Sequence, residues 1–233
     1  NYKMYLLTSI SNSDQARNFF IEMETSIVTG SSYHKTPSKS MNIVSLKYNP
    51  TWTPTFNIMK RNAKKENGDW NWGWIESHNF DVYSHNTKEQ LTWDEAKNMK
   101  LSEIFMVSPP SEDNALGKIK FETDSTQSIY FHDTNEKNYF EQASRARSSG
   151  CVRVNNPYDF AAKLAYRNRS YIENNISQGT TYWENVENTP VYFYYDIIEY
   201  NVDGNDVVKV TDDPYDYYEN YLKTQKNDYI IEK

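Results

Sequence analysis

The segments of this chain that favour β-strands fall into two groups, with a stretch of different character between them. Strand-like runs cover residues 3–8, 19–29, 42–48, 118–123, 128–132, 191–200 and 207–210. Their β-branched and aromatic residues suit a pleated, half-buried surface. Asp203-Gly204-Asn205 tolerates positive φ and predicts a hairpin between the last two runs. We therefore expect one domain over residues 1–233, mainly β with flanking helices, of the α+β class.

Residues 53–108 differ from their surroundings. Helices are predicted over Phe56–Lys65 and Thr92–Met99, three tryptophans gather at 70–74, and two prolines follow at 109–110. Large aromatic side chains mostly serve packing, so a small separate core is favoured over direct stacking on a ligand. We interpret this segment as a lobe inserted into the β scaffold.

A further helix is predicted after the only cysteine of the chain. Asn156-Pro157 places a proline in a first helical turn. Phe160, Ala161, Leu164 and Ala165 then share one face. This helix is expected to pack on the sheet beside the cysteine.

Composition excludes several classes of function. A net charge of -7 without a basic stripe argues against a nucleic-acid partner. No run of about 18 apolar residues is present to span a membrane, and Asn1 is not followed by signal-peptide features. His34, His78 and His85 are scattered and are interpreted as surface residues. No metal and no cofactor are expected.

The pairing of Cys151 with His132 is the best indication of chemistry. A lone thiol forms no intramolecular disulfide, and Ser149 and Gly150 leave its sulfur open, while His132, 19 residues upstream, can take its proton. Single cysteines and strand histidines are also common core residues, so spacing alone leaves that alternative open. The small turn before Cys151 and Arg153 after it suit an anion and favour acyl transfer through a thioester.

Several segments together resemble a known family. These are His132-Asp133-Thr134, Arg145-Ala146, the run Ser148 to Val154 and Asn156-Pro157, preceded in order by Thr29-Gly30, Lys35-Thr36-Pro37, Asn49 to Trp52 and Asn114 to Phe121. The pattern resembles the peptidoglycan L,D-transpeptidases of the YkuD family, and within it the YcbB-like branch. The likeness covers nearly the whole chain.

Two positions depart from the general family pattern. Ser149 stands where the general family pattern has histidine, and the YcbB-like branch commonly carries serine at this position. Asp133 stands where many members have glycine or serine. The resemblance implies that the backbone carbonyl of residue 133 orients His132, so the Asp133 side chain matters less.

Roles for the remaining site residues follow from the turn and from the family. The N–H groups of Gly150 and Cys151 are expected to bind the oxyanion. Tyr130 shares a strand face with His132, and the resemblance supports a role for its hydroxyl there. For Arg153, holding a substrate carboxylate and forming a structural ion pair stay equally open. Ser149 either donates a hydrogen bond or keeps the turn small.

The resemblance also implies fold, substrate and place of action. It implies a YkuD-type β-sandwich in which residues 53–108 form a capping lid, and tetrapeptide stems of peptidoglycan as donor and acceptor. Cys151 would attack before the terminal D-alanine, and a diaminopimelate amine would close a 3→3 cross-link. Carbapenems would acylate Cys151. Export to the periplasm or cell envelope is implied, with any membrane anchor lying outside this sequence, as part of a larger precursor.

Three functions remain open at this point. The first is the cross-linking transferase. The second is a hydrolase of the same fold, either an L,D-carboxypeptidase or an amidase that releases wall-anchored proteins. The third is a non-catalytic peptidoglycan-binding domain, favoured by the many aromatic residues and disfavoured by the intact set of His132, Gly150 and Cys151.

Overall fold

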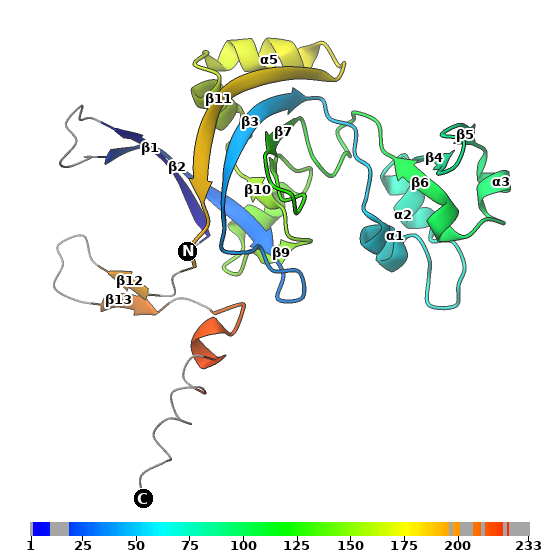
Figure 1. The fold of residues 1–233 in the computed structure, drawn as a ribbon, viewed down its shortest axis with the longest axis horizontal. Helices are drawn as coiled ribbons and strands as arrows, with labels where there is room; N and C mark the ends of the chain where they lie inside the picture. The colour runs from blue at the N-terminus through cyan, green and yellow to red at the C-terminus, as the bar shows by residue number, and fades with distance from the viewer. Residues whose placement is uncertain are drawn as a thin grey trace, which may run out of the picture.

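A computed structural model describes residues 2–9, 19–195, 198–200, 207–210, 213–220 and 223. Its main sheet has eight strands in the order β1-β2-β10-β8-β7-β3-β11, with β9 paired to β2 (Figure 1). The strands are β1 (Lys3–Ser9), β2 (Phe19–Gly30), β3 (Ser40–Tyr48), β7 (Ile119–Thr123), β8 (Phe131–His132), β9 (Ala146–Ser148), β10 (Val152–Val154) and β11 (Tyr182–Tyr192). The predicted fold class, mainly β with flanking helices, is confirmed.

One face of the sheet carries the main hydrophobic core. Alternate residues of the central strands, such as Leu46, Phe121 and Phe131, are fully buried on this face. The helix α4 (Pro157–Leu164) covers them, and the rings of Phe121 and Phe160 lie 4.9 Å apart. Each such side chain contributes roughly 2–3 kcal/mol by leaving water. The core fixes the position of β7, β8 and β10, which carry the candidate site.

The predicted helix at Pro157 is confirmed, and the helix α5 (Arg169–Ser177), which was not predicted, follows it. Asn168 caps α5 by accepting a hydrogen bond from the Tyr171 N–H at 2.9 Å. Ile172 is the buried residue of this helix. An apolar stripe this thin gives little periodic signal in the sequence.

Two strand predictions need correction. The run Ser128–His132 forms a strand only at its last two residues, because Ser128 has a φ of 56° and the Ile129 carbonyl accepts the Thr123 hydroxyl. The run 191–200, predicted as one strand, is divided: residues 198–200 belong to a separate strand, and Val191 and Tyr192 are the end of β11, which begins at Tyr182. β11 is the edge of the sheet, so its polar residues face water and Pro190 is tolerated.

The predicted hairpin near the C-terminus is present. The strands β12 (Ile198–Tyr200) and β13 (Val207–Val210) pair antiparallel. Its expected turn residues, 203–205, lie outside the described residues.

Residues between Trp52 and Ser108 form a lobe beside the main sheet (Figure 1). The two residues exchange backbone hydrogen bonds of 2.8 and 2.9 Å, which closes its neck. Within it lie α1 (Phe56–Asn62), α2 (Trp72–Ser77), α3 (Trp93–Ala96), the short helix Leu101–Glu103 and a sheet of β4 (Asp81–Ser84), β5 (Gln90–Leu91) and β6 (Ile104–Val107). A second short helix, Lys137–Glu141, lies outside the lobe.

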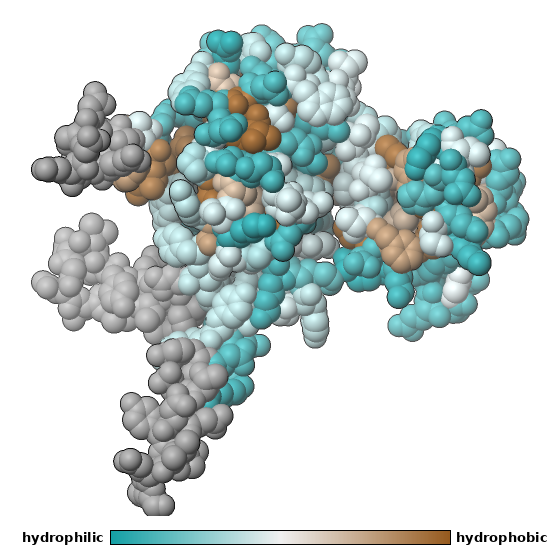
Figure 2. All heavy atoms as spheres, in the orientation of Figure 1, coloured by the Kyte–Doolittle hydropathy of each residue, from teal (hydrophilic) through white to brown (hydrophobic). Residues whose placement is uncertain are grey.

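The lobe has a buried cluster of its own, which includes Met59, Val82 and Met106. In Figure 2 most of the lobe is hydrophilic on the face shown, as expected for a segment that packs its apolar side chains internally. This cluster lies within the segment interpreted as an insert, and the assignment of residues 53–108 as a separate subdomain stays a prediction. Its capping role stays a prediction.

The three tryptophans at 70–74 pack within the lobe. Trp70 is buried in the cluster and its ring lies 5.9 Å from that of Trp93, while Trp72 is 39% exposed and contacts both. The lobe helices are shorter than predicted. The helix α1 ends at Asn62, because Lys64 pairs with Trp70 in a β-bridge, and α3 keeps only the turn capped by Thr92.

Across the described residues, no helix combines the length and apolar character needed to cross a bilayer.

The segment 213–220 is anchored on the loop that follows β2. The buried Tyr215 hydroxyl donates to the Gly30 carbonyl at 2.7 Å and accepts from the Thr36 N–H at 3.2 Å. The Lys35 ammonium donates to the Tyr215 carbonyl at 2.8 Å. Thr36 in turn contacts the turn that holds Cys151, so this anchoring supports the candidate site.

Replacing Tyr215 with phenylalanine should destabilise the protein by about 1–3 kcal/mol, because a buried carbonyl and a buried N–H lose their partner. Urea unfolding measures the change in the free energy of unfolding. The control is Tyr217→Phe, at a residue that is 40% exposed. Equal stability of both variants would show that the Tyr215 hydroxyl does not anchor the loop.

Candidate active site

Parallel pairing of β8 with β10 brings His132 and Cys151 together. Phe131 pairs with Val152 and His132 with Arg153, so Cys151 lies one residue before the paired segment. A cavity of about 240 Å³ is lined by His132 and Cys151, and also by the predicted site residues Tyr130, Ser149 and Arg153. Of the predicted site residues, Gly150 and Asp133 do not line it.

A second hollow, of about 390 Å³, lies between Lys39, Asp124 and Tyr192. Its lining holds neither cysteine nor histidine. We therefore take the smaller cavity as the candidate site.

The turn before Cys151 is fixed by hydrogen bonds. Gly150 has a φ of 116°, a region that disfavours any residue with a Cβ. Its carbonyl accepts from the Thr36 hydroxyl at 2.8 Å, and its N–H donates to the Ser148 hydroxyl at 3.1 Å. Ser148 also donates to the Cys151 carbonyl at 2.5 Å. These bonds define the direction in which Cys151 presents its sulfur.

The Gly150 N–H was expected to bind the oxyanion, but it already donates a hydrogen bond to the Ser148 hydroxyl. The Cys151 N–H donates no hydrogen bond within the described part of the chain. An oxyanion in the cavity would therefore meet the Cys151 N–H, without help from the Gly150 N–H.

The Cys151 thiol is partly exposed. It donates to the Ser128 carbonyl at 3.6 Å and is hydrogen-bonded to the Tyr130 hydroxyl. Burial raises the pKa of the thiol, and the Tyr130 contact opposes that shift. Burial, and then the neighbouring Cys151, raise the pKa of the Tyr130 hydroxyl. At neutral pH the sulfur and the phenol both keep their protons.

His132 is buried and held in one orientation. Its Nδ1 contacts the Asp133 backbone carbonyl. Because a carbonyl only accepts, Nδ1 carries the proton and Nε2 has a free lone pair. Burial, and next the charge of Arg153, lower the pKa of His132 to about 3. The imidazole is therefore neutral at pH 7 and can accept a proton at Nε2.

The Asp133 side chain has a structural position. Its carboxylate accepts from the Lys118 N–H at 2.9 Å and from the Lys137 ammonium. A Cβ at Gly117 would lie 2.4 Å from the Asp133 carboxyl carbon, so this packing requires glycine there. The carbonyl of Asp133, and not its carboxylate, thus faces His132.

Arg153 makes the ion pair that was one of its two predicted roles. Its Nη1 lies 2.6 Å from a Glu136 carboxylate oxygen. Its Nε is buried and has no hydrogen-bond partner. Arg153 also lines the cavity, so a role toward a substrate carboxylate stays open beside the ion pair.

Two residues of the site had no signal in the sequence. Arg61, on α1 of the lobe, donates to the Ser149 hydroxyl at 3.0 Å, and its other terminal nitrogen lies 2.5 Å from Nε2 of His34. Both line the cavity, so the interpretation of His34 as a plain surface residue is incomplete. The contact depends on how the lobe sits against the sheet, which local patterns do not encode.

Within the described residues, no group of three or more histidine, cysteine, aspartate or glutamate side chains is arranged to hold a metal ion.

Comparison with known proteins identifies the family of the chain. The family model YkuD, the L,D-transpeptidase catalytic domain, matches residues 3–193. The chain belongs to this family. A curated Haemophilus influenzae protein named "Putative L,D-transpeptidase" is 26% identical over 183 residues, which are 74% of this chain and 36% of that protein. The chain thus spans about a third of the length of this curated relative.

Replacing His132 with asparagine should remove a pH dependence of stability. The unfolded histidine has a pKa near ~6.5, whereas the folded one lies at about 3. As pH falls below about 6.5, His132 binds a proton in the unfolded state, whereas in the folded state it stays neutral down to a pH of about 3. The free energy of unfolding of the wild type therefore falls by up to about 1.4 kcal/mol for each pH unit between these two pKa values, and this effect is absent at higher pH.

Urea unfolding of this L,D-transpeptidase domain at several pH values from 4 to 8 measures the effect. Asparagine keeps a donor near the Asp133 carbonyl, so the variant should fold. The difference in unfolding free energy between wild type and variant should rise with pH up to about 6.5 and then stay level. A constant difference across the range would contradict a neutral buried imidazole.

Proposed function

We propose that this domain is a cysteine L,D-transpeptidase that forms 3→3 cross-links between peptidoglycan stems. The observation that carries the proposal is one cavity lined by the Cys151 thiol, the neutral His132 and the Tyr130 hydroxyl. This set supplies a nucleophile, a base and an oxyanion donor. Membership of the family supports peptidoglycan as substrate.

In the acylation step, the Cys151 sulfur attacks the carbonyl between diaminopimelate and the terminal D-alanine. The thiol proton passes to His132 Nε2, a C–S bond forms, and the carbonyl oxygen becomes an anion facing the Cys151 N–H and the Tyr130 hydroxyl. As the C–N bond breaks, the proton moves from Nε2 to the departing D-alanine amine. The product is a thioester on Cys151.

Before substrate binds, the site favours a neutral Cys151 thiol and a neutral His132 over a thiolate–imidazolium ion pair, so the proton is transferred during the attack. Burial keeps the pKa of the thiol above its ordinary value and that of His132 far below its own. A thiolate beside an imidazolium is therefore unfavourable before substrate binds. His132 acts as a general base only when the thiol meets a carbonyl.

We also propose that the lobe caps the donor stem through Arg61. The ion pairs of the described residues include none with Arg61, so its charge is available to an anion in the cavity. The D-alanine carboxylate of the donor is such an anion. Closing the lobe over the stem would orient the scissile bond and exclude water.

Replacing Arg61 with glutamine should raise the KM for a tetrapeptide donor by roughly tenfold with little change in kcat, because a charge-assisted hydrogen bond is lost. D-alanine release measures both constants. The matched control is Lys60→Gln, the exposed neighbour on α1. An unchanged KM would remove Arg61 from the donor site.

The other functions differ in what receives the acyl group. A hydrolase passes the thioester to water, and a binding domain forms no thioester. We favour the transferase because the family model that matches residues 3–193 is that of the L,D-transpeptidase catalytic domain. Action in the periplasm or cell envelope follows from the proposed substrate and is part of the same proposal.

Incubation with purified muropeptides should yield a cross-linked dimer and free D-alanine, and Cys151→Ala should abolish both while keeping the thermal stability of the wild type. Mass spectrometry separates the outcomes. A shortened monomer would indicate a hydrolase, and unchanged substrate would indicate a binding domain.

A carbapenem should add one adduct mass to Cys151, the only thiol of the chain. Its rate should rise with pH and fall in His132→Asn, because the neutral thiol is the poorer nucleophile. In Tyr130→Phe acylation should also slow, since one oxyanion donor is lost. Peptide mapping locates the adduct, and its absence on folded protein would refute the cysteine mechanism.

A further inference from the structure

A row of directly paired residues leads from His132 across the main sheet. His132 of β8 pairs with Lys120 of β7, Lys120 with Lys47 of β3, and Lys47 with Trp183 of β11. Paired residues on neighbouring strands project from the same face. The alternate residues on the other face, such as Leu46 and Phe121, belong to the core. The row therefore lies on the face that carries the catalytic histidine.

The charges along this row do not balance. Lys120 forms an ion pair with Glu122, with 2.8 Å between Nζ and a carboxylate oxygen. Its ammonium also lies 3.9 Å from the centre of the Tyr130 ring. Lys47 has no carboxylate at ion-pair distance among the described residues, and its ammonium lies over the Trp183 ring at 4.5 Å. Burial, and next the charge of Lys120, lower the pKa of Lys47.

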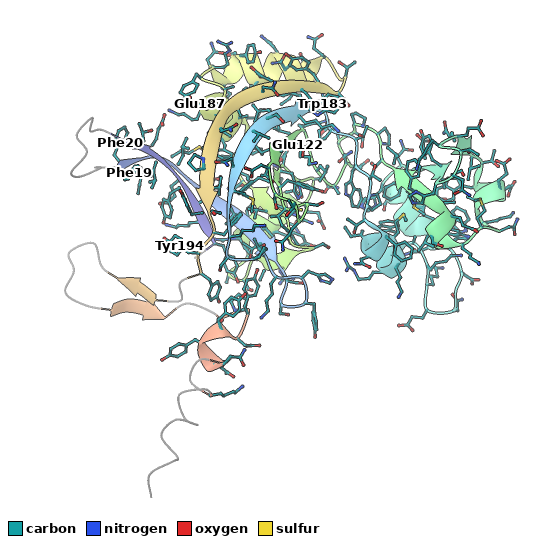
Figure 3. All side chains as sticks on the ribbon, viewed as in Figure 1. Phe19, Phe20, Glu122, Trp183, Glu187 and Tyr194 are labelled. Carbon is teal, nitrogen blue, oxygen red and sulfur yellow. The ribbon has the colours of Figure 1, made fainter. Side chains whose placement is uncertain are left out.

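Two like charges directly opposite each other on antiparallel strands destabilise a sheet. The main core does not require this arrangement, because both lysines point away from it. An anionic group bound beside Lys47 would offset the repulsion. Trp183, which is 55% exposed, adds an apolar surface at the outer end of the row. Trp183 and Glu122 are labelled in Figure 3, on the strands that flank β3.

We propose that the row Lys120, Lys47 and Trp183 is the binding site of the acceptor stem, with Lys47 holding a carboxylate of that peptide. This inference rests on the proposed transpeptidase function. The donor stem occupies the cavity on the Arg61 side, whose lining includes none of the three residues. The acceptor amine must reach both the thioester and the base, so it lies at His132 and the rest of its chain follows the row.

The dimensions agree with this placement. Neighbouring strands are about 4.8 Å apart, so Lys47 lies roughly 10 Å and Trp183 roughly 14 Å from His132 along the sheet. The acceptor amine is on the side chain of diaminopimelate, the third residue of the stem, and three extended residues span about 10 Å. With this amine at His132, the diaminopimelate carboxylate lies within reach of the Lys47 side chain, and the first residues of the stem extend toward Trp183.

The transfer step balances on groups already named. The acceptor nitrogen bonds to the thioester carbonyl carbon, and its proton passes to His132 Nε2. The C–S bond then breaks, and the proton returns from Nε2 to the Cys151 sulfur. Lys47 and Trp183 position the acceptor and take no part in proton transfer.

The test compares Lys47→Gln and Trp183→Ala with the wild type, using a tetrapeptide donor and a diaminopimelate-containing tripeptide acceptor that cannot itself release D-alanine. The KM for the acceptor should rise roughly tenfold in Lys47→Gln and several-fold in Trp183→Ala. The rate of carbapenem acylation should stay unchanged in both. Controls are Lys65→Gln and Tyr166→Ala, at exposed positions away from the row.

A second arm uses the same acceptor with its C-terminal carboxyl amidated. The wild type should then bind it as weakly as Lys47→Gln binds the free acid, and Lys47→Gln should not distinguish the two peptides. Unchanged acceptor KM in both variants, or slower carbapenem acylation in them, would overturn the assignment. A wild type that acquires no carbapenem adduct would instead refute the proposed function, and this inference with it.

Discussion

The pairing of β8 with β10 is the constraint on which the site depends. It is a short parallel contact of two residue pairs, one of which is His132 with Arg153. Cys151 directly precedes the paired residues of β10 and lines the cavity. Short parallel pairing is stable only when both faces of the strands are supported. The core supplies one face through Phe131 and Val152, and the lobe packs against Tyr130 on the other. Packing from two separate hydrophobic clusters thus positions Cys151 and His132, the proposed nucleophile and base.

Hydrogen bonds fix the turn before Cys151, in addition to the pairing of β8 with β10. Thr36 holds the Gly150 carbonyl, Ser148 holds the N–H, and Tyr215 holds the loop that carries Thr36. Buried polar networks of this kind rigidify a site because every member is satisfied. The positive φ of Gly150 fits this arrangement without strain, because glycine has no Cβ. The geometry of the cysteine turn therefore depends on segments nearly 200 residues apart, from Gly30 to Tyr215.

Sequence patterns predicted the elements whose structure depends mainly on the residues within them. Alternating β-branched residues located the strand ending at Tyr48, and Pro157 with its apolar face located α4. They failed where tertiary context decides. The strand from Tyr182 is polar because it is an edge, and Ser128 leaves the strand because a side-chain hydroxyl takes the next carbonyl. In the site, Cys151 and His132 were predicted from their context, whereas Arg61 and the Lys47 row emerge only when lobe and strands are assembled.

The neutral state of Cys151 has a consequence for the durability of the enzyme. Peroxides oxidise thiolates far faster than thiols, so a sulfur whose pKa burial has raised is a slow target while the site is empty. Cys151 is the only cysteine of the chain, so a sulfenic acid formed there has no partner within the chain that could rescue it as a disulfide. In the proposed mechanism the thiol ionises only when a carbonyl arrives, which would limit irreversible oxidation of the group on which catalysis depends.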